Sequence, residues 1–225
     1  MTSSKMDEET QGLLRKILRA QAYRQIMAAN IRGHGLKFLL DSEGRIGLVA
    51  DIQHILQQVR RVQELYTSIG GGDIRREASV KMERIPYPET RFELAAFLAT
   101  SDLAEKTALE SYLNSSCTAL ASIARNDLDY ERTATIRSHA LFQEFAGDPA
   151  QKPLVRQVLN RWLTICLLSL GRPGTAGDRR ACELGLRSLS CADSIRLYIE
   201  RLAPILEISD VDLSELADAG VELPS

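Results

Sequence analysis

The chain has 225 residues, a length that fits one large or two small domains. Its 28 Lys and Arg residues nearly balance 30 Asp and Glu residues, and the net charge of −2 argues against binding nucleic acid through a basic surface. The composition is typical of a globular protein with a sizeable core, and no apolar run approaches the roughly 20 residues that span a bilayer. The polar, acidic N-terminus predicts no secretory signal peptide, so we expect a cytoplasmic protein that binds neither nucleic acid nor membrane.

Helix-breaking residues are confined to a few positions, which predicts long helices. Proline is absent from residues 1–85 and 89–148, and glycine is absent from 73–146. No window alternates polar and apolar residues for long enough to predict a strand. The cysteines form no CxxC pair, so we expect free thiols at Cys117, Cys166, Cys182 and Cys191.

The first two predicted helices are separated by a short polar segment. We expect residues 1–9 to be a disordered tail and the first helix to begin after Asp7 or Thr10 and end near Leu40, before a turn at 41–44. Three consecutive glycines at 70–72 end the second helix. One face of that helix is apolar and carries Ile52, Ile55, Leu56, Val59, Val62, Tyr66 and Ile69.

The remaining chain predicts further helices after a long connector at 73–90. Their ranges are 91–115, 116–145 and 150–170, with one or two shorter helices within 179–206. We therefore expect residues 1–225 to form a single all-α domain, a four-helix bundle with additional C-terminal helices in which 171–225 is a helical cap.

The interior of a four-helix bundle is where this architecture builds metal sites, from lone carboxylates and E-x-x-H pairs. This sequence contains no E-x-x-H. The nearest pattern is D-x-x-H at Asp51 and His54, and both residue types bind metals, although a surface or capping role is the simpler interpretation.

The predicted connector is basic and could contact a phosphate group. A solvated surface segment is the simpler interpretation of such a cluster. The residues concerned are Arg75, Arg76, Lys81 and Arg84.

Several segments resemble the phenylacetate-catabolic oxygenase family, which includes the catalytic and structural subunits of phenylacetyl-CoA epoxidase. The resemblance covers most of the chain and implies a ferritin-like fold. It is carried by residues 22–34 (AYRQIMAANIRGH), 48–54 (LVADIQH), 67–70 (TSIG), 111–126 (SYLNSSCTALASIARN), 158–162 (VLNRW), 168–171 (LSLG) and 220–224 (GVELP).

The resemblance also implies that the family's di-iron ligands are mostly replaced here. The corresponding positions are Phe38, Ile55, Gln58, Thr100, Asp127 and Tyr130. Only Asp127 keeps a carboxylate, and one acid cannot neutralise and hold two iron ions. We therefore expect a metal-free relative without a cofactor, with bundle packing at Phe38, Ile55 and Thr100 and its acidic residues on solvated helix faces.

The function that this resemblance implies is non-catalytic. We expect a structural or interaction protein linked to phenylacetate or aromatic-acid catabolism, which forms a homodimer or docks to a homologous oxygenase subunit. One alternative is a di-iron oxygenase with a remodelled site at Asp51, His54, Asp127 and Tyr130. A second alternative is a CoA-thioester binding protein that uses the basic connector. A dry bundle interior would favour the structural role, whereas a polar cavity would favour a site.

Overall fold

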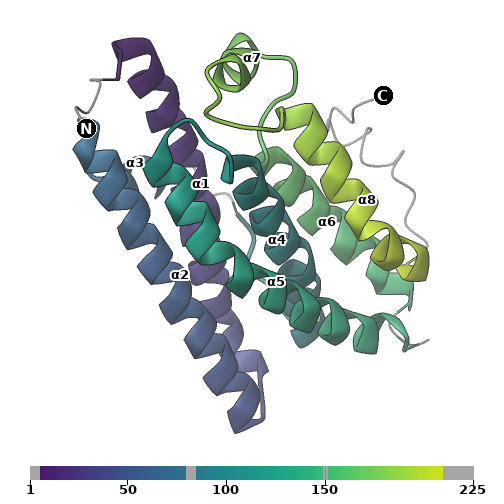
Figure 1. Ribbon diagram of the computed structural model, residues 1–225. Helices are drawn as coiled ribbons and strands as arrows, with labels where there is room; N and C mark the ends of the chain where they lie inside the picture. The colour runs from purple at the N-terminus through teal and green to yellow at the C-terminus, as the bar shows by residue number, and fades with distance from the viewer. Residues whose placement is uncertain (1–5, 80–84, 149, 151, 210–225) are drawn as a thin grey trace.

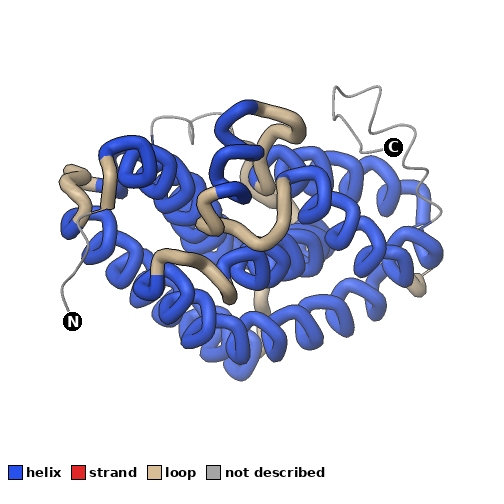
Figure 2. The backbone as a smooth tube through the Cα atoms, turned by 45° about the horizontal axis from the view of Figure 1, so that its top comes forward, coloured by secondary structure: helices blue, strands red, loops and turns tan. Residues whose placement is uncertain are grey.

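The computed structural model describes residues 6–79, 85–148, 150 and 152–209, and within them every regular element is helical (Figures 1 and 2). The expected all-α class is therefore confirmed. The α-helices are α1 (Glu8–Gly35), α2 (Ser42–Ser68), α3 (Ile74–Ser79), α4 (Arg91–Tyr112), α5 (Thr118–Ala146), α6 (Lys152–Ser169), α7 (Ala176–Glu183) and α8 (Cys191–Ser209), with a 3-10 turn, η1, at Leu36–Phe38.

Two helix pairs form the main body of the bundle. The turn at 36–41 returns the chain from α1 into α2, and these two long helices pack along each other (Figure 1). Among the described helices, the most extensive packing joins α4 to α5, and the two pairs meet where α1 packs on α4 and α2 on α5. This packing is that of a helical bundle.

Helix α4 is the centre of the fold. It contacts α1, α5, α6 and α8, and nearly all of its residues are buried. A helix that is covered on all sides has no solvated face, which explains why its sequence is rich in alanine and leucine without a clear amphipathic stripe. Phe97 of α4 meets the fully buried Trp162 of α6 edge to face, with 5.0 Å between ring centroids.

The C-terminal helices are part of this body. Helix α8 packs on α4, α5 and α6, and its fully buried Tyr198 donates a hydrogen bond to the Thr100 carbonyl oxygen at 3.1 Å. Within the expected cap at 171–225, α8 therefore packs against the core of the bundle, α7 packs on α1, and residues 210–225 lie outside the described part of the chain.

Side-chain caps explain where the long helices begin. Asp7, Asp41 and Thr90 each accept a hydrogen bond from a backbone N–H of the first helical turn, at 2.7, 2.5 and 3.1 Å. The expected turn at 41–44 is wrong, because Asp41 is the N-cap of α2 and the next three residues are already helical.

Helix α1 begins at Glu8, directly after Asp7, which is one of the two expected starts, so residues 8 and 9 are helical and do not belong to the expected tail. Two other boundaries differ from expectation. Helix α1 ends at Gly35 instead of continuing to Leu40. The connector at 73–90 contains α3, which packs on α1 and begins with the fully buried Ile74. The expected stop after α2 is confirmed, since Gly70 has φ +80°, a conformation that glycine adopts at little cost.

All four cysteines are free thiols, as expected. Among the described residues, no helix combines the length and the apolar character that a membrane crossing requires.

Candidate functional site

Polar side chains from four helices meet inside the bundle, where the α1–α2 pair faces the α4–α5 pair. We call this group the polar core; it comprises Gln21, Arg24, Gln25 and Arg32 of α1, Gln58 of α2, Asp102 and Glu105 of α4, and Glu131 of α5, all buried. Most of them line a cavity of about 20 Å³. Such a cavity holds about one water molecule and is far too small for a coenzyme.

Glu105 links α1 to α4. Its carboxylate accepts hydrogen bonds from Arg24 Nε at 3.1 Å, from Gln25 Nε2 at 3.2 Å and from Gln21 Nε2. Arg24 also donates to the carbonyl oxygen of Ser169 at 2.8 Å, which ties the end of α6 to the same group. Each of these contacts satisfies a charge or an amide that burial would otherwise leave unpaired.

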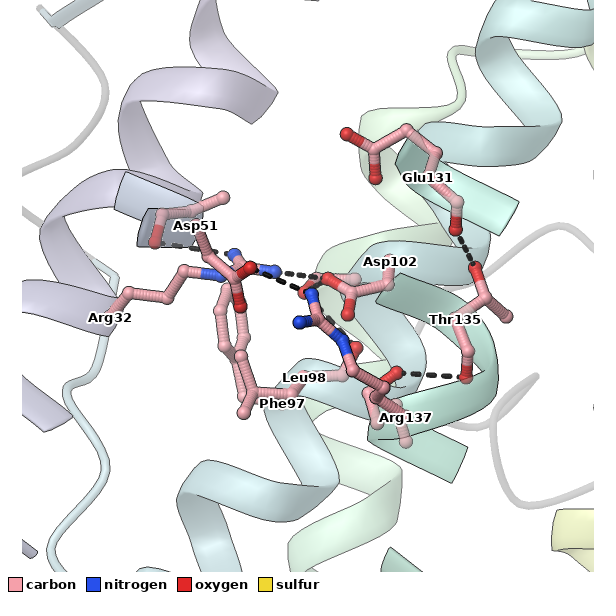
Figure 3. A network of polar contacts seen from close by, with 12 residues as sticks. Arg32, Asp51, Phe97, Leu98, Asp102, Glu131, Thr135 and Arg137 are labelled. Carbon is pink, nitrogen blue, oxygen red and sulfur yellow. Dashed lines mark hydrogen bonds and ion pairs between the residues drawn. The ribbon is translucent and has the colours of Figure 1, made fainter. Parts of the chain in front are cut away.

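A second ion pair, Arg32 with Asp102, lies nearby on the same two helices. Burial disfavours the charge on Arg32, but the nearby carboxylates, that of Asp102 first and then that of Asp51, outweigh it and raise the Arg32 pKa. Figure 3 shows Arg32 and Asp102 meeting between their helices, with Asp51 and Arg137 beside them. The Arg32 guanidinium also lies 6.0 Å from the ring centroid of Phe97.

Glu131 differs from the other two acids of the polar core, because within the described part of the chain it forms no ion pair with an arginine. Burial, together with the neighbouring carboxylates of Glu105 and Asp102, raises its pKa well above the usual value. Gln58 Nε2 donates a hydrogen bond to Glu131 Oε1 at 3.0 Å. The neutral acid form is therefore favoured, and two guanidinium cations then face two carboxylate anions around the cavity.

This pKa predicts an unusual pH dependence. Glu131 keeps its proton in the folded chain at pH values where the unfolded chain, with a pKa near 4.5, has lost it. The stabilisation by the neutral acid is thus complete below pH 4.5 and is lost as the pH rises through the folded pKa. The free energy of unfolding should therefore fall with rising pH, by at most about 1.4 kcal/mol per pH unit for one proton.

The Glu131→Gln variant, a neutral isostere, should lose this decline and exceed the wild type in stability at alkaline pH. Urea unfolding across a pH series measures the difference. Glu144→Gln changes an exposed acid of the same helix and is the matched control. An unchanged pH slope in Glu131→Gln would contradict the assignment of a neutral Glu131.

The positions that the family resemblance selects are only partly in the polar core. Ile55 and Gln58 line the cavity, but Phe38, Thr100, Asp127 and Tyr130 do not. The Thr100 hydroxyl donates to backbone carbonyl oxygens of its own helix at 2.9 and 3.0 Å, and Phe38 lies in η1, beyond the end of α1.

Asp127 is fully buried and accepts a hydrogen bond from Arg61. Burial raises its pKa to about 6, and the adjacent Arg61 opposes this rise. Its carboxylate therefore serves an ion pair between α2 and α5, one turn before Glu131 on the same helix.

The four residues of the alternative metal site, Asp51, His54, Asp127 and Tyr130, do not all meet at one place. The His54 ring stacks on Tyr130, with 3.6 Å between centroids, and Tyr130 donates its hydroxyl hydrogen to Asp51, which also binds Arg137 at 2.8 Å. Burial, with Arg61 nearby, lowers the pKa of His54. These three residues lie together, whereas Asp127 is paired with Arg61. The described residues contain no group of three His, Cys, Asp or Glu side chains that could hold a metal ion.

The basic connector is only partly described. Arg75 and Arg76 lie on α3 and are exposed, whereas Lys81 and Arg84 lie outside the described residues.

The expectation that the acids lie on solvated helix faces is wrong for the central ones. Asp102, Glu105, Asp127 and Glu131 are all buried. Sequence reasoning missed the arginines and acids of the polar core. The available signal was the pair of acids three residues apart within the apolar sequence of α4, together with two arginines eight residues apart on α1.

No family model matches this chain, and no curated protein is significantly similar to it. The family resemblance therefore rests on the segments quoted above, and the class that the structure itself defines is an all-α helical bundle with a charged interior.

Proposed function

We propose that this protein is a non-catalytic, metal-free helical bundle that acts as a structural or interaction protein. The observation that carries the proposal is the pairing of Glu105 with Arg24 and of Asp102 with Arg32 inside the bundle. The carboxylates that could have held metal ions instead balance two internal guanidinium groups.

The donor set of the polar core does not fit a di-iron centre. Such centres combine carboxylates with two histidines, one from each E-x-x-H pair. The polar core has two arginines, amides and three acids, and no histidine. A dication placed between two guanidinium groups would be repelled, and each carboxylate that it recruited would leave a buried arginine unpaired.

A polar interior alone would favour a ligand site. Here the small volume of the cavity and the ion pairs among the side chains of the polar core support the structural proposal instead. The cavity of about 20 Å³ leaves no room for an organic substrate. A CoA thioester could then bind only at the surface. Of the basic connector residues that could contact its phosphate groups, the structure describes Arg75 and Arg76. Calorimetric titration with phenylacetyl-CoA and with free CoA tests that alternative, and we expect no heat of binding with either.

The finer fold class that we propose is ferritin-like. Two helix pairs joined by one long connection, here 69–90, are typical of ferritin-like bundles. Together with the resemblance to the phenylacetate-catabolic oxygenases, this arrangement supports a relationship to the structural subunit of that family and a link to aromatic-acid catabolism.

Metal analysis of the full chain, purified from iron-supplemented cells, tests the proposal. We expect far less than one iron per chain, with the same content in the wild type and in Asp127→Ala. Glu64→Ala, which alters an exposed acid of α2, is the control for surface-bound metal. Near-stoichiometric iron that is lost in Asp127→Ala or His54→Ala would overturn the proposal in favour of the remodelled di-iron oxygenase.

A further inference from the structure

Two glutamine side chains of the polar core each keep a buried amide oxygen without a partner. Gln25 of α1 and Gln58 of α2 are 1% and 0% exposed, and both line the cavity. Their amide nitrogens donate to Glu105 at 3.2 Å and to Glu131 at 3.0 Å, which fixes the orientation of each amide group. The Oε1 atom of each glutamine then accepts no hydrogen bond from any described residue. Such a buried acceptor is costly, and in folded proteins it is usually satisfied by a protein donor or by ordered water.

Glu131 adds a hydrogen-bond donor to the same cavity. Burial and the neighbouring carboxylates raise the pKa of Glu131, so its carboxyl group keeps a proton. One carboxyl oxygen accepts the bond from Gln58, which leaves the other oxygen to carry the O–H. In Figure 3 the carboxyl group of Glu131 points away from Thr135, whose hydroxyl group bonds only to the Glu131 backbone oxygen. The cavity is thus lined by two acceptors and one donor that the described residues do not pair.

The size of the cavity and this set of donors and acceptors select water as the ligand. A volume of about 20 Å³ holds about one water molecule, and a buried water usually makes about three hydrogen bonds. One water can donate to both glutamine oxygens and accept from Glu131. A halide ion only accepts, so both amide oxygens would repel it. A cation accepts no bond from Glu131, and it would add charge to an interior in which two guanidinium groups already balance two carboxylates.

We propose that this cavity is a binding site for a single water molecule, which bridges Gln25 of α1, Gln58 of α2 and Glu131 of α5. Within the described part of the chain, the two glutamines share no direct hydrogen bond. Because Gln25 also binds Glu105 of α4, the water connects side chains from all four main helices into one network. The inference rests on the metal-free interior proposed above, but the metal content of the chain and the occupant of the cavity are separate measurements and can fail independently.

A high-resolution crystal structure of the full chain tests the site. We expect one ordered water within hydrogen-bond distance of both glutamine oxygens. Crystals soaked in bromide or rubidium salts, or pressurised with xenon, should show no anomalous signal there. A bromide or rubidium peak would identify an ion site, and a xenon peak would identify a dry apolar cavity. Any of these peaks, or a cavity without density in the native crystal, would overturn the proposal.

Magnetic relaxation dispersion of the solvent tests the site in solution, because it counts internal water molecules with long residence times. We expect the wild type to hold one more such water per chain than Gln58→Leu, which removes one acceptor at similar side-chain volume. Gln57→Leu alters an exposed glutamine of the same helix, so it is the matched control and should keep the wild-type count. A wild type without a long-lived water, or an equal count in Gln58→Leu, would contradict the proposal; the wild-type measurement decides the matter even if Gln58→Leu fails to fold.

Discussion

Glu105→Ala is expected to lower the free energy of unfolding by about 3–5 kcal/mol, the usual cost of removing one partner from a buried ion pair. The substitution leaves the buried guanidinium of Arg24 without its carboxylate, and it removes the acceptor of Gln21 and Gln25. Since these bonds join α1 to α4, the loss acts on the contact between the two helix pairs. Urea unfolding followed by circular dichroism measures it.

Two variants separate this cost from a general effect of removing an acid. Glu64→Ala breaks an exposed pair with Arg60 on α2 and should change stability by less than about 0.5 kcal/mol. Glu105→Gln keeps the shape and part of the hydrogen bonding but not the charge, so it should lie between the wild type and Glu105→Ala. Equal, small effects of Glu105→Ala and Glu64→Ala would show that the polar core does not hold the pairs together.

The order of the helices could be predicted because its determinants are local. Glycines at 70–72 and at 147 end α2 and α5, and the absence of proline from 89–148 permits the two long helices α4 and α5. The caps are local as well, yet the sequence around Asp41 predicts a turn, because an N-cap and a turn favour the same residue types.

The polar core could not be predicted, because its contacts connect distant parts of the sequence. Arg24 and Glu105 are 81 positions apart, and Arg32 and Asp102 are 70 apart. The hydrophobic periodicity does not reveal these residues either. Nearly all of α4 is buried, so its sequence has no separate polar and apolar faces, and a buried acid cannot be recognised by its position on the apolar face.

On α4, the position that the family resemblance selects, Thr100, lies on a different face of the helix from the buried acid Glu105. Thr100 lies on the side where Tyr198 of α8 bonds to its backbone, whereas Glu105, about one and a half turns later, faces α1. On α5, Asp127 precedes Glu131 by one turn, and only Glu131 lines the cavity. Of the six positions that the resemblance selects, only Ile55 and Gln58 line the cavity.

Replacing Arg32 and Asp102 together should be far less harmful than replacing either alone. Arg32→Met leaves the Asp102 carboxylate buried without its partner, and Asp102→Leu leaves the guanidinium in the same state, so each single variant should lose about 3–5 kcal/mol of stability. In the double variant no charge of this pair remains buried, and its stability should return to within about 1 kcal/mol of the wild type or exceed it. Urea unfolding of the four proteins gives the coupling free energy.

The stability of the double variant shows whether this helical bundle keeps the Arg32–Asp102 pair in its interior for stability. If the double variant is as stable as the wild type, the pair is not retained for stability, and its remaining physical role is to set the register of α1 against α4. A change in register would appear as lost chemical-shift dispersion or broadened amide signals in the double variant at undiminished stability. If the effects of the single variants instead simply add, Arg32 and Asp102 act independently, and the polar core is a set of separate contacts and not one coupled network.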